Sequence, residues 1–150
     1  MEAGRILLVE DDPNDIELTL AALGASGITN RIVVVRDGAE ALDYLYRRGG
    51  YESRAAGNPA VTLLDLKLPK VDGLEVLEQI KDEPDLKAIP VVVLTSSRED
   101  EDLLSSYRSG ANAYVVKPIG FHEFIEVVSE VKVFWAVINE PPPGSVGQRN

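Results

Sequence analysis

The 150-residue sequence contains no cysteine and a single histidine, His122. Without cysteine there is no disulfide framework, no thiolate chemistry and no zinc–thiolate site. One histidine excludes multi-histidine metal sites and argues against a histidine-driven catalytic triad. No apolar run is long enough to span a membrane, and the first residues lack the regions of a signal peptide. We therefore expect a cytoplasmic protein without a membrane partner.

Basic residues are also in the minority. The chain has 15 Lys and Arg against 25 Asp and Glu, a formal net charge of −10. This balance suits the polyanionic backbone of nucleic acid poorly, so we expect no nucleic-acid partner. The length is that of one domain with a sizeable core.

Short apolar runs alternate with amphipathic stretches along the chain. The apolar runs predict five strands, at residues 5–9, 31–36, 60–64, 90–94 and 113–116. The amphipathic stretches predict five helices, at residues 13–25, 38–47, 74–80, 99–109 and 121–138. Five β/α units imply a parallel sheet with helices on both faces and right-handed crossovers. We expect one domain over residues 1–138, followed by a Pro-rich extension at 139–150 with no separate effector domain.

Polar residues follow four of these strands at the point where each strand ends. Glu10 and Asp11 follow the first strand, Asp65 the third, Thr95 the fourth and Lys117 the fifth. In an open parallel α/β sheet, ligands bind at the carboxyl ends of the strands. We therefore expect these side chains to meet at one edge.

Three carboxylates that converge repel one another unless a cation joins them. Oxygen ligands without nitrogen or sulfur favour Mg²⁺. Beside such an ion, Asp65 could act as a nucleophile toward phosphorus, with Thr95 and Lys117 contacting the phosphoryl oxygens.

Simpler readings exist for each residue taken alone. Asp12 precedes Pro13 and is interpreted as a helix cap, and Glu10 and Asp11 could be solvated loop acids. Thr95 could cap the next helix, and Lys117 could be a surface lysine. Their recurrence at one sheet edge favours the metal and phosphoryl hypothesis.

Four segments, residues 9–13, 64–73, 93–96 and 113–118, resemble the signature segments of response-regulator receiver domains of two-component signalling. The resemblance covers about residues 4–130. It implies a flavodoxin-like, doubly wound α/β fold with five parallel strands in the order 2-1-3-4-5, the order known from the chemotaxis receiver, and five helices.

The resemblance also implies roles for residues. Asp65 matches the phosphoacceptor. Glu10 and Asp11 match the acidic pair, with Asp11 the more direct Mg²⁺ ligand and Glu10 acting through water. Lys67 matches the position whose backbone carbonyl binds the metal. Its side chain is a departure, since many relatives carry Asn or a similar residue there.

Three further positions are carried over from the family. Thr95 matches the hydroxyl that follows the phosphoryl group on activation, and Lys117 matches the amine, before an expected cis peptide at Pro118. Tyr114 matches the aromatic switch, although simple core packing explains it equally well.

The function implied is a stand-alone receiver that accepts a phosphoryl group from a sensor histidine kinase. It is a phosphoacceptor that catalyses its own phosphorylation and dephosphorylation, not an enzyme acting on a separate substrate. The alternative is a Mg²⁺-dependent aspartyl-phosphate phosphatase or hydrolase. That class needs a second Asp two residues after the nucleophile, where this chain has Lys67. A third hypothesis is a flavodoxin-like cofactor carrier. It would need a phosphate-binding loop rich in Gly, Ser or Thr after the first strand, whereas this chain has acids there.

The end of the last helix is apolar around its whole circumference over residues 133–138, which implies a partner surface. A helix end covered by the tail is the alternative. The long loop at residues 49–58 and the Pro-rich end resemble receivers associated with bacterial phytochromes, which implies a bacteriophytochrome kinase. It also implies a homodimer through the fourth helix, fifth strand, fifth helix and extension, with Phe134, Trp135 and Ile138 in the interface.

Overall fold

Five parallel strands form the centre of the molecule. The structure, a computed structural model, describes residues 4–95, 105–117 and 121–130. The strands are β1 (Ile6–Val9), β2 (Ile32–Val35), β3 (Val61–Leu64), β4 (Val91–Thr95) and β5 (Ala113–Val116). They pair in the order β2-β1-β3-β4-β5, all parallel, which confirms the predicted doubly wound sheet.

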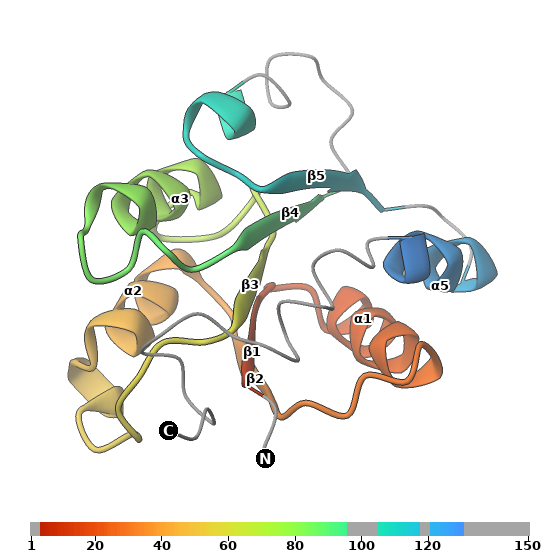
Figure 1. Cartoon of the computed structure of the whole chain (residues 1–150), viewed down its shortest axis with the longest axis horizontal. Coiled ribbons are helices and arrows are strands. Elements are labelled where there is room, and N and C mark those ends of the chain that lie inside the picture. Colours follow the sequence, from red (N-terminus) through yellow and green to blue (C-terminus); the bar gives the residue numbers. More distant parts are fainter. Residues whose placement is uncertain (1–3, 96–104, 118–120, 131–150) are drawn as a thin grey trace.

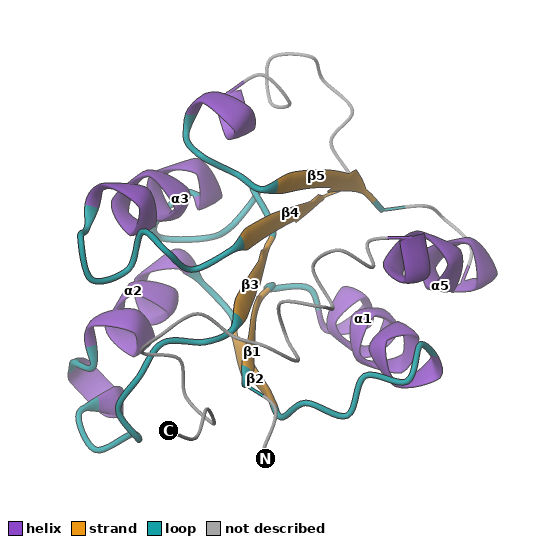
Figure 2. Cartoon of the chain, viewed as in Figure 1, coloured by secondary structure: helices purple, strands orange, loops and turns teal. Residues whose placement is uncertain are grey.

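Helices cover both faces of this sheet (Figure 1). On one face lie α1 (Pro13–Ala25) and α5 (Phe121–Glu130), and on the other lie α2 (Gly38–Tyr46) and α3 (Gly73–Asp82). Figure 2 shows the strands as a single layer between the two pairs of helices. Because both faces are covered, the strands are continuous apolar runs instead of alternating polar and apolar residues.

Alternate residues of β1 enter the two cores. Ile6 and Leu8 lie in the core with α1 and α5, where Phe124 is fully buried. Leu7 and Val9 lie in the core with α2 and α3. β1 is therefore packed on both faces, and the residues that follow it start from a fixed position.

The long connection after α2 is more ordered than a loop prediction suggests. It begins with a 3₁₀ turn at Gly49–Tyr51. The Arg54 guanidinium lies 4.3 Å from the centre of the Tyr44 ring, within cation–π range. Its Nε donates to the Tyr44 carbonyl at 2.6 Å and its Nη1 to the Gly57 carbonyl at 2.9 Å. One arginine thus fixes the connection against the end of α2.

Several predicted features lie partly or wholly outside the described residues. Of the helix predicted at 99–109, residues 105–108 are described as helical, before Gly110 with φ +103°. Helix α5 is described to Glu130. The expected cis peptide at Pro118, the interface residues Phe134, Trp135 and Ile138, and the extension at 139–150 lie outside the described ranges. Within the described part of the chain, no helix is long and apolar enough to cross a membrane.

Candidate functional site

The strand register brings the predicted site residues to one edge of the sheet. Val9 of β1 pairs with Leu64 of β3, and the amide of Asp65 donates to the Val9 carbonyl at 3.0 Å. Glu10 and Asp65 therefore leave the sheet side by side. Lys117 follows Val116, which pairs with Thr95 at the end of β4.

The Lys117 ammonium is the centre of the site. Its Nζ donates to a carboxylate oxygen of Glu10, to Asp65 Oδ2 at 3.2 Å and to Asp15 Oδ2 at 3.1 Å. The side chains of Lys117, Glu10 and Asp65 are 6%, 2% and 11% exposed, whereas that of Asp15 is 36% exposed. The second Asp65 oxygen, Oδ1, accepts from the Lys67 amide at 3.1 Å. Two donors from different elements therefore fix the orientation of the Asp65 carboxylate.

Burial and mutual charge shift the acid–base behaviour of this cluster. Burial, together with the negative charge of Asp65, raises the pKa of Glu10 to about 7, although the hydrogen bond from Lys117 opposes the shift. Burial alone would lower the pKa of Lys117. The hydrogen bond to Glu10 and the charges of Asp65 and Glu10 outweigh burial, and the pKa of Lys117 is raised. The ammonium is therefore charged throughout the neutral range.

The cluster fits a divalent cation. One carboxylate oxygen each from Glu10, Asp15 and Asp65 lies within 4.8 Å of the others. Three carboxylates face one ammonium, which leaves two negative charges when all are ionised. Carboxylate oxygens are the hard ligands that Mg²⁺, Mn²⁺ and Ca²⁺ prefer.

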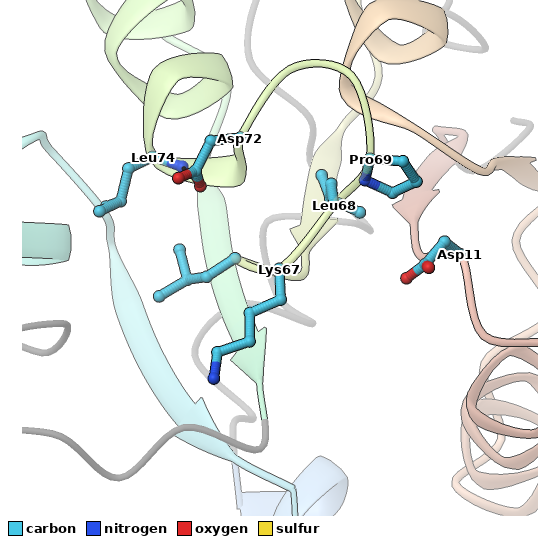
Figure 3. A pocket seen from close by; sticks show the side chains of 7 residues that line it. Asp11, Lys67, Leu68, Pro69, Asp72 and Leu74 are labelled. Atoms are coloured by element: carbon cyan, nitrogen blue, oxygen red, sulfur yellow. Dashed lines mark hydrogen bonds between the residues drawn. The ribbon is translucent and has the colours of Figure 1, made fainter.

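Asp11 lies apart from this cluster. It is exposed and lines a cavity of about 440 Å³ together with Lys67, Pro69 and Asp72. Figure 3 shows Asp11 at one side of this cavity, with the Lys67 side chain extending away from it. The role of Asp11 as the more direct metal ligand stays a prediction, and so does that of the Lys67 carbonyl.

The two residues expected to move on activation lie on the neighbouring strands. Thr95 is the last residue of β4, and its side chain is outside the described part of the structure. Tyr114 is half-buried on β5 and packs against the core beneath α2 and α3. Their roles as phosphoryl contact and aromatic switch stay predictions.

Asp15 is a member of the cluster that our sequence analysis missed. In the sequence it looks like an ordinary first-turn acid of α1, where carboxylates favour the helix dipole. The available signal is its spacing: it stands two residues after Pro13, in the first turn of α1, shortly after the acids that follow β1.

A glycine keeps the acceptor loop close to α3. A Cβ atom at Gly73 would lie 2.3 Å from the Asp65 carbonyl oxygen and 2.6 Å from the Leu66 Cα. No side chain fits at that distance, so Gly73 allows the first turn of α3 to pack directly behind Asp65. Asp72 caps this helix by accepting from the Leu74 amide at 3.1 Å.

This fold, with a buried lysine among acids at the strand ends, defines a class of signalling domain. Residues 6–129 match the response regulator receiver domain family, and the chain belongs to that family. The hydrolase alternative is not favoured.

Two relatives are similar to this chain over most of its length. The probable methanogenesis regulatory protein FilR2 of Methanothrix harundinacea is 47% identical over 138 residues, covering 91% of this chain and 86% of that protein. The response regulator Rcp1 of Synechocystis is 42% identical over 130 residues, covering 87% of each chain.

Solved structures give the same grouping. The bacteriophytochrome response regulator RtBRR is 59% identical, with a TM-score of 0.77, over 95% of this chain and 86% of that one. The phosphorylated cyanobacterial phytochrome response regulator RcpA is 42% identical, with a TM-score of 0.81, over 89% and 94%. The Mn²⁺-bound form of Rcp1 is 42% identical, with a TM-score of 0.80, over 88% and 94%.

Proposed function

We propose that this response regulator accepts a phosphoryl group from a sensor histidine kinase on Asp65. The observation that carries the proposal is the contact of one buried ammonium, Lys117, with both Asp65 and Glu10. The phosphorylated state of RcpA, at 42% identity, supports it. The protein then acts as a phosphoacceptor with its own catalytic groups, not as an enzyme on a separate substrate.

The transfer uses residues already in place. A carboxylate oxygen of Asp65 attacks phosphorus, the phosphorus–nitrogen bond to the kinase histidine breaks, and an acyl phosphate forms on Asp65. Lys117 neutralises charge on the phosphoryl oxygens, and the Lys67 amide holds the carboxylate in one orientation. Attack of water on the same phosphorus releases inorganic phosphate and restores the carboxylate.

We propose that Mg²⁺ is the metal, held by Glu10, Asp11 and Asp65 with the Lys67 carbonyl. When bound, Mg²⁺ supplies positive charge against the phosphoryl oxygens and the converging carboxylates. The Mn²⁺-bound form of Rcp1 supports a divalent cation at such a site. The neighbouring cluster of three carboxylates around Lys117 carries two net negative charges when all four groups are ionised, which a divalent cation would balance.

The raised pKa of Glu10 makes cation affinity depend on pH. Below about pH 7 Glu10 takes up a proton, and a protonated carboxyl group competes with the cation. We expect Mg²⁺ affinity to fall by about tenfold for each pH unit below that value, and to level off above it. Calorimetric titration from pH 8 to pH 6 measures this.

The Glu10→Gln variant is the matched control for the pH experiment. Its Mg²⁺ affinity should be weaker at pH 8 and nearly constant over the same range, because no carboxyl group at position 10 takes up a proton. An equal pH slope in both proteins would contradict the assignment to Glu10.

We propose that the kinase is a bacteriophytochrome. Support comes from the identity of 59% to RtBRR, whose description as a bacteriophytochrome response regulator names such a sensor. Phosphoryl transfer to this chain should be measured from a phytochrome kinase and from an unrelated histidine kinase, and it should be faster from the phytochrome kinase. Equal rates from both at low kinase concentration would contradict the proposal.

We further propose a homodimer through the fourth helix, β5, α5 and the extension, with Phe134, Trp135 and Ile138 in the interface. The all-round apolar sequence of residues 133–138 carries this proposal. Sedimentation velocity at micromolar concentration should show a dimer that Trp135→Lys converts to monomer. A wild-type protein that sediments only as monomer would contradict it.

Stoichiometry separates an acceptor from a hydrolase. With acetyl phosphate and Mg²⁺, the acceptor takes up at most one phosphoryl group per chain. With a small aryl phosphate, it shows no repeated turnover. Many turnovers per chain, lost in Asp65→Asn, would instead show a phosphatase.

A further inference from the structure

The first turn of α1 carries a feature that the phosphoacceptor chemistry does not explain. Asp12 caps the helix, accepting from the Asn14 amide at 2.8 Å and the Asp15 amide at 3.4 Å. A Glu or Gln at the position of Asp15 commonly reaches back to the amide of the capping residue. Here the Asp12 amide donates to Glu10 Oε2 at 3.3 Å. The Asp15 carboxylate instead contacts Lys117 at 3.1 Å.

The three carboxylates around Lys117 differ in burial and in their other contacts. Asp65 carries the reaction and accepts from the Lys67 amide, and Glu10 is almost fully buried and accepts from the Asp12 amide. Asp15 comes from a different element, α1, and holds the ammonium from the partly exposed side of the cluster. Unlike Asp65, Asp15 does not carry the reaction, and unlike Glu10 it is not among the proposed metal ligands.

We propose that Asp15 is a positioning residue for phosphoryl transfer, which holds the Lys117 ammonium beside Asp65. The proposal rests on the function proposed for Asp65. A cation shared by Glu10 and Asp65 weakens the hold of both carboxylates on Lys117, and a phosphoryl group on Asp65 changes its contact with the ammonium. Asp15 then keeps Lys117 directed at the reacting oxygen. Asp15 acts through Lys117 and does not touch the phosphoryl group.

The first test is the rate of phosphorylation by acetyl phosphate. Asp15→Asn should lower the rate at saturating donor about tenfold, the equivalent of one hydrogen bond to a charged group. The donor concentration for half-maximal rate should stay within about twofold. Asp15→Glu should recover most of the loss, and Glu17→Gln, an exposed acid on the same helix, should behave as wild type. An Asp15→Asn rate equal to that of Glu17→Gln would overturn the proposal.

The second test asks whether Asp15 acts through Lys117, using urea unfolding midpoints in a double-mutant cycle. With Lys117 present, Asp15→Asn should lower the midpoint. In the Lys117→Met background it should leave the midpoint unchanged or raise it, because Asp15 then faces only carboxylates. A purely structural role at the start of α1 would lower the midpoint in both backgrounds, which would overturn the proposal.

Mg²⁺ titration separates positioning from metal ligation. Asp15→Asn should bind Mg²⁺ within about tenfold of Glu17→Gln, since it loses a nearby charge but none of the proposed metal ligands. A loss of more than about tenfold would show that Asp15 is a metal ligand, and would also overturn the proposal. If wild-type protein takes up no phosphoryl group, the proposed function itself fails. If wild-type protein is phosphorylated but the Asp15 variants do not behave as expected, only the positioning role of Asp15 is contradicted.

Discussion

Asp65→Asn is expected to abolish uptake of a phosphoryl group, measured as intact mass after incubation with acetyl phosphate and Mg²⁺. Asn has nearly the shape of Asp and can still accept from Lys117. However, it lacks the carboxylate that attacks phosphorus. Among the described residues, Asp65 is the acid that contacts both Lys117 and the Lys67 amide, so none of the other described acids is held equivalently by both donors.

The control for this experiment removes a charge elsewhere. Asp85→Asn changes an exposed acid beyond α3 and should be labelled as wild type. Labelling of Asp65→Asn to the wild-type extent would refute the acceptor assignment. Uptake lost in both variants would show that the effect is not specific to the site.

Replacing Lys117 by Met is expected to have the largest effect on stability. Its ammonium is the shared partner of Glu10, Asp15 and Asp65. Without it, these carboxylates repel one another in a largely buried cluster. Removing one partner of a buried ion pair costs about 3–5 kcal/mol of unfolding free energy. Because Asp15 is partly exposed, water still solvates its charge and the penalty is smaller. We therefore expect a loss of about 3 kcal/mol of unfolding free energy in metal-free solution.

Mg²⁺ should recover much of this loss, because a divalent cation can replace the missing positive charge. Urea unfolding with and without Mg²⁺ measures both effects. Lys87→Met, at an exposed position, is the control and should change little. If Lys117→Met were as stable as wild type without Mg²⁺, Lys117 would not be balancing the carboxylates.

Much of the fold could be predicted from the sequence, because it depends on local pattern. Apolar runs of strand length, separated by amphipathic stretches, predict a parallel sheet, and the family resemblance supplies the strand order. The Asp12–Pro13 cap was also readable, and the structure confirms it. Apart from the strand order, these features depend on residues near one another in sequence.

The rest depends on contacts between distant residues. Asp15 joins the cluster through its contact with Lys117, which stands 102 residues later in the sequence. The connection after α2 is ordered by Arg54 stacking on Tyr44, which composition alone does not reveal. The requirement for glycine at position 73, its close approach to the Asp65 carbonyl, likewise comes from packing.

The central claim is that the acids following β1 and β3 form, with Lys117, a cation-dependent phosphoryl acceptor. The most direct measurement is the intact mass of the wild-type protein after incubation with acetyl phosphate, once with Mg²⁺ and once with a chelator in excess. We predict a gain of one phosphoryl group with Mg²⁺, sensitive to hydroxylamine as an acyl phosphate, and little gain with the chelator. No gain with Mg²⁺, or the same gain in both samples, would contradict it.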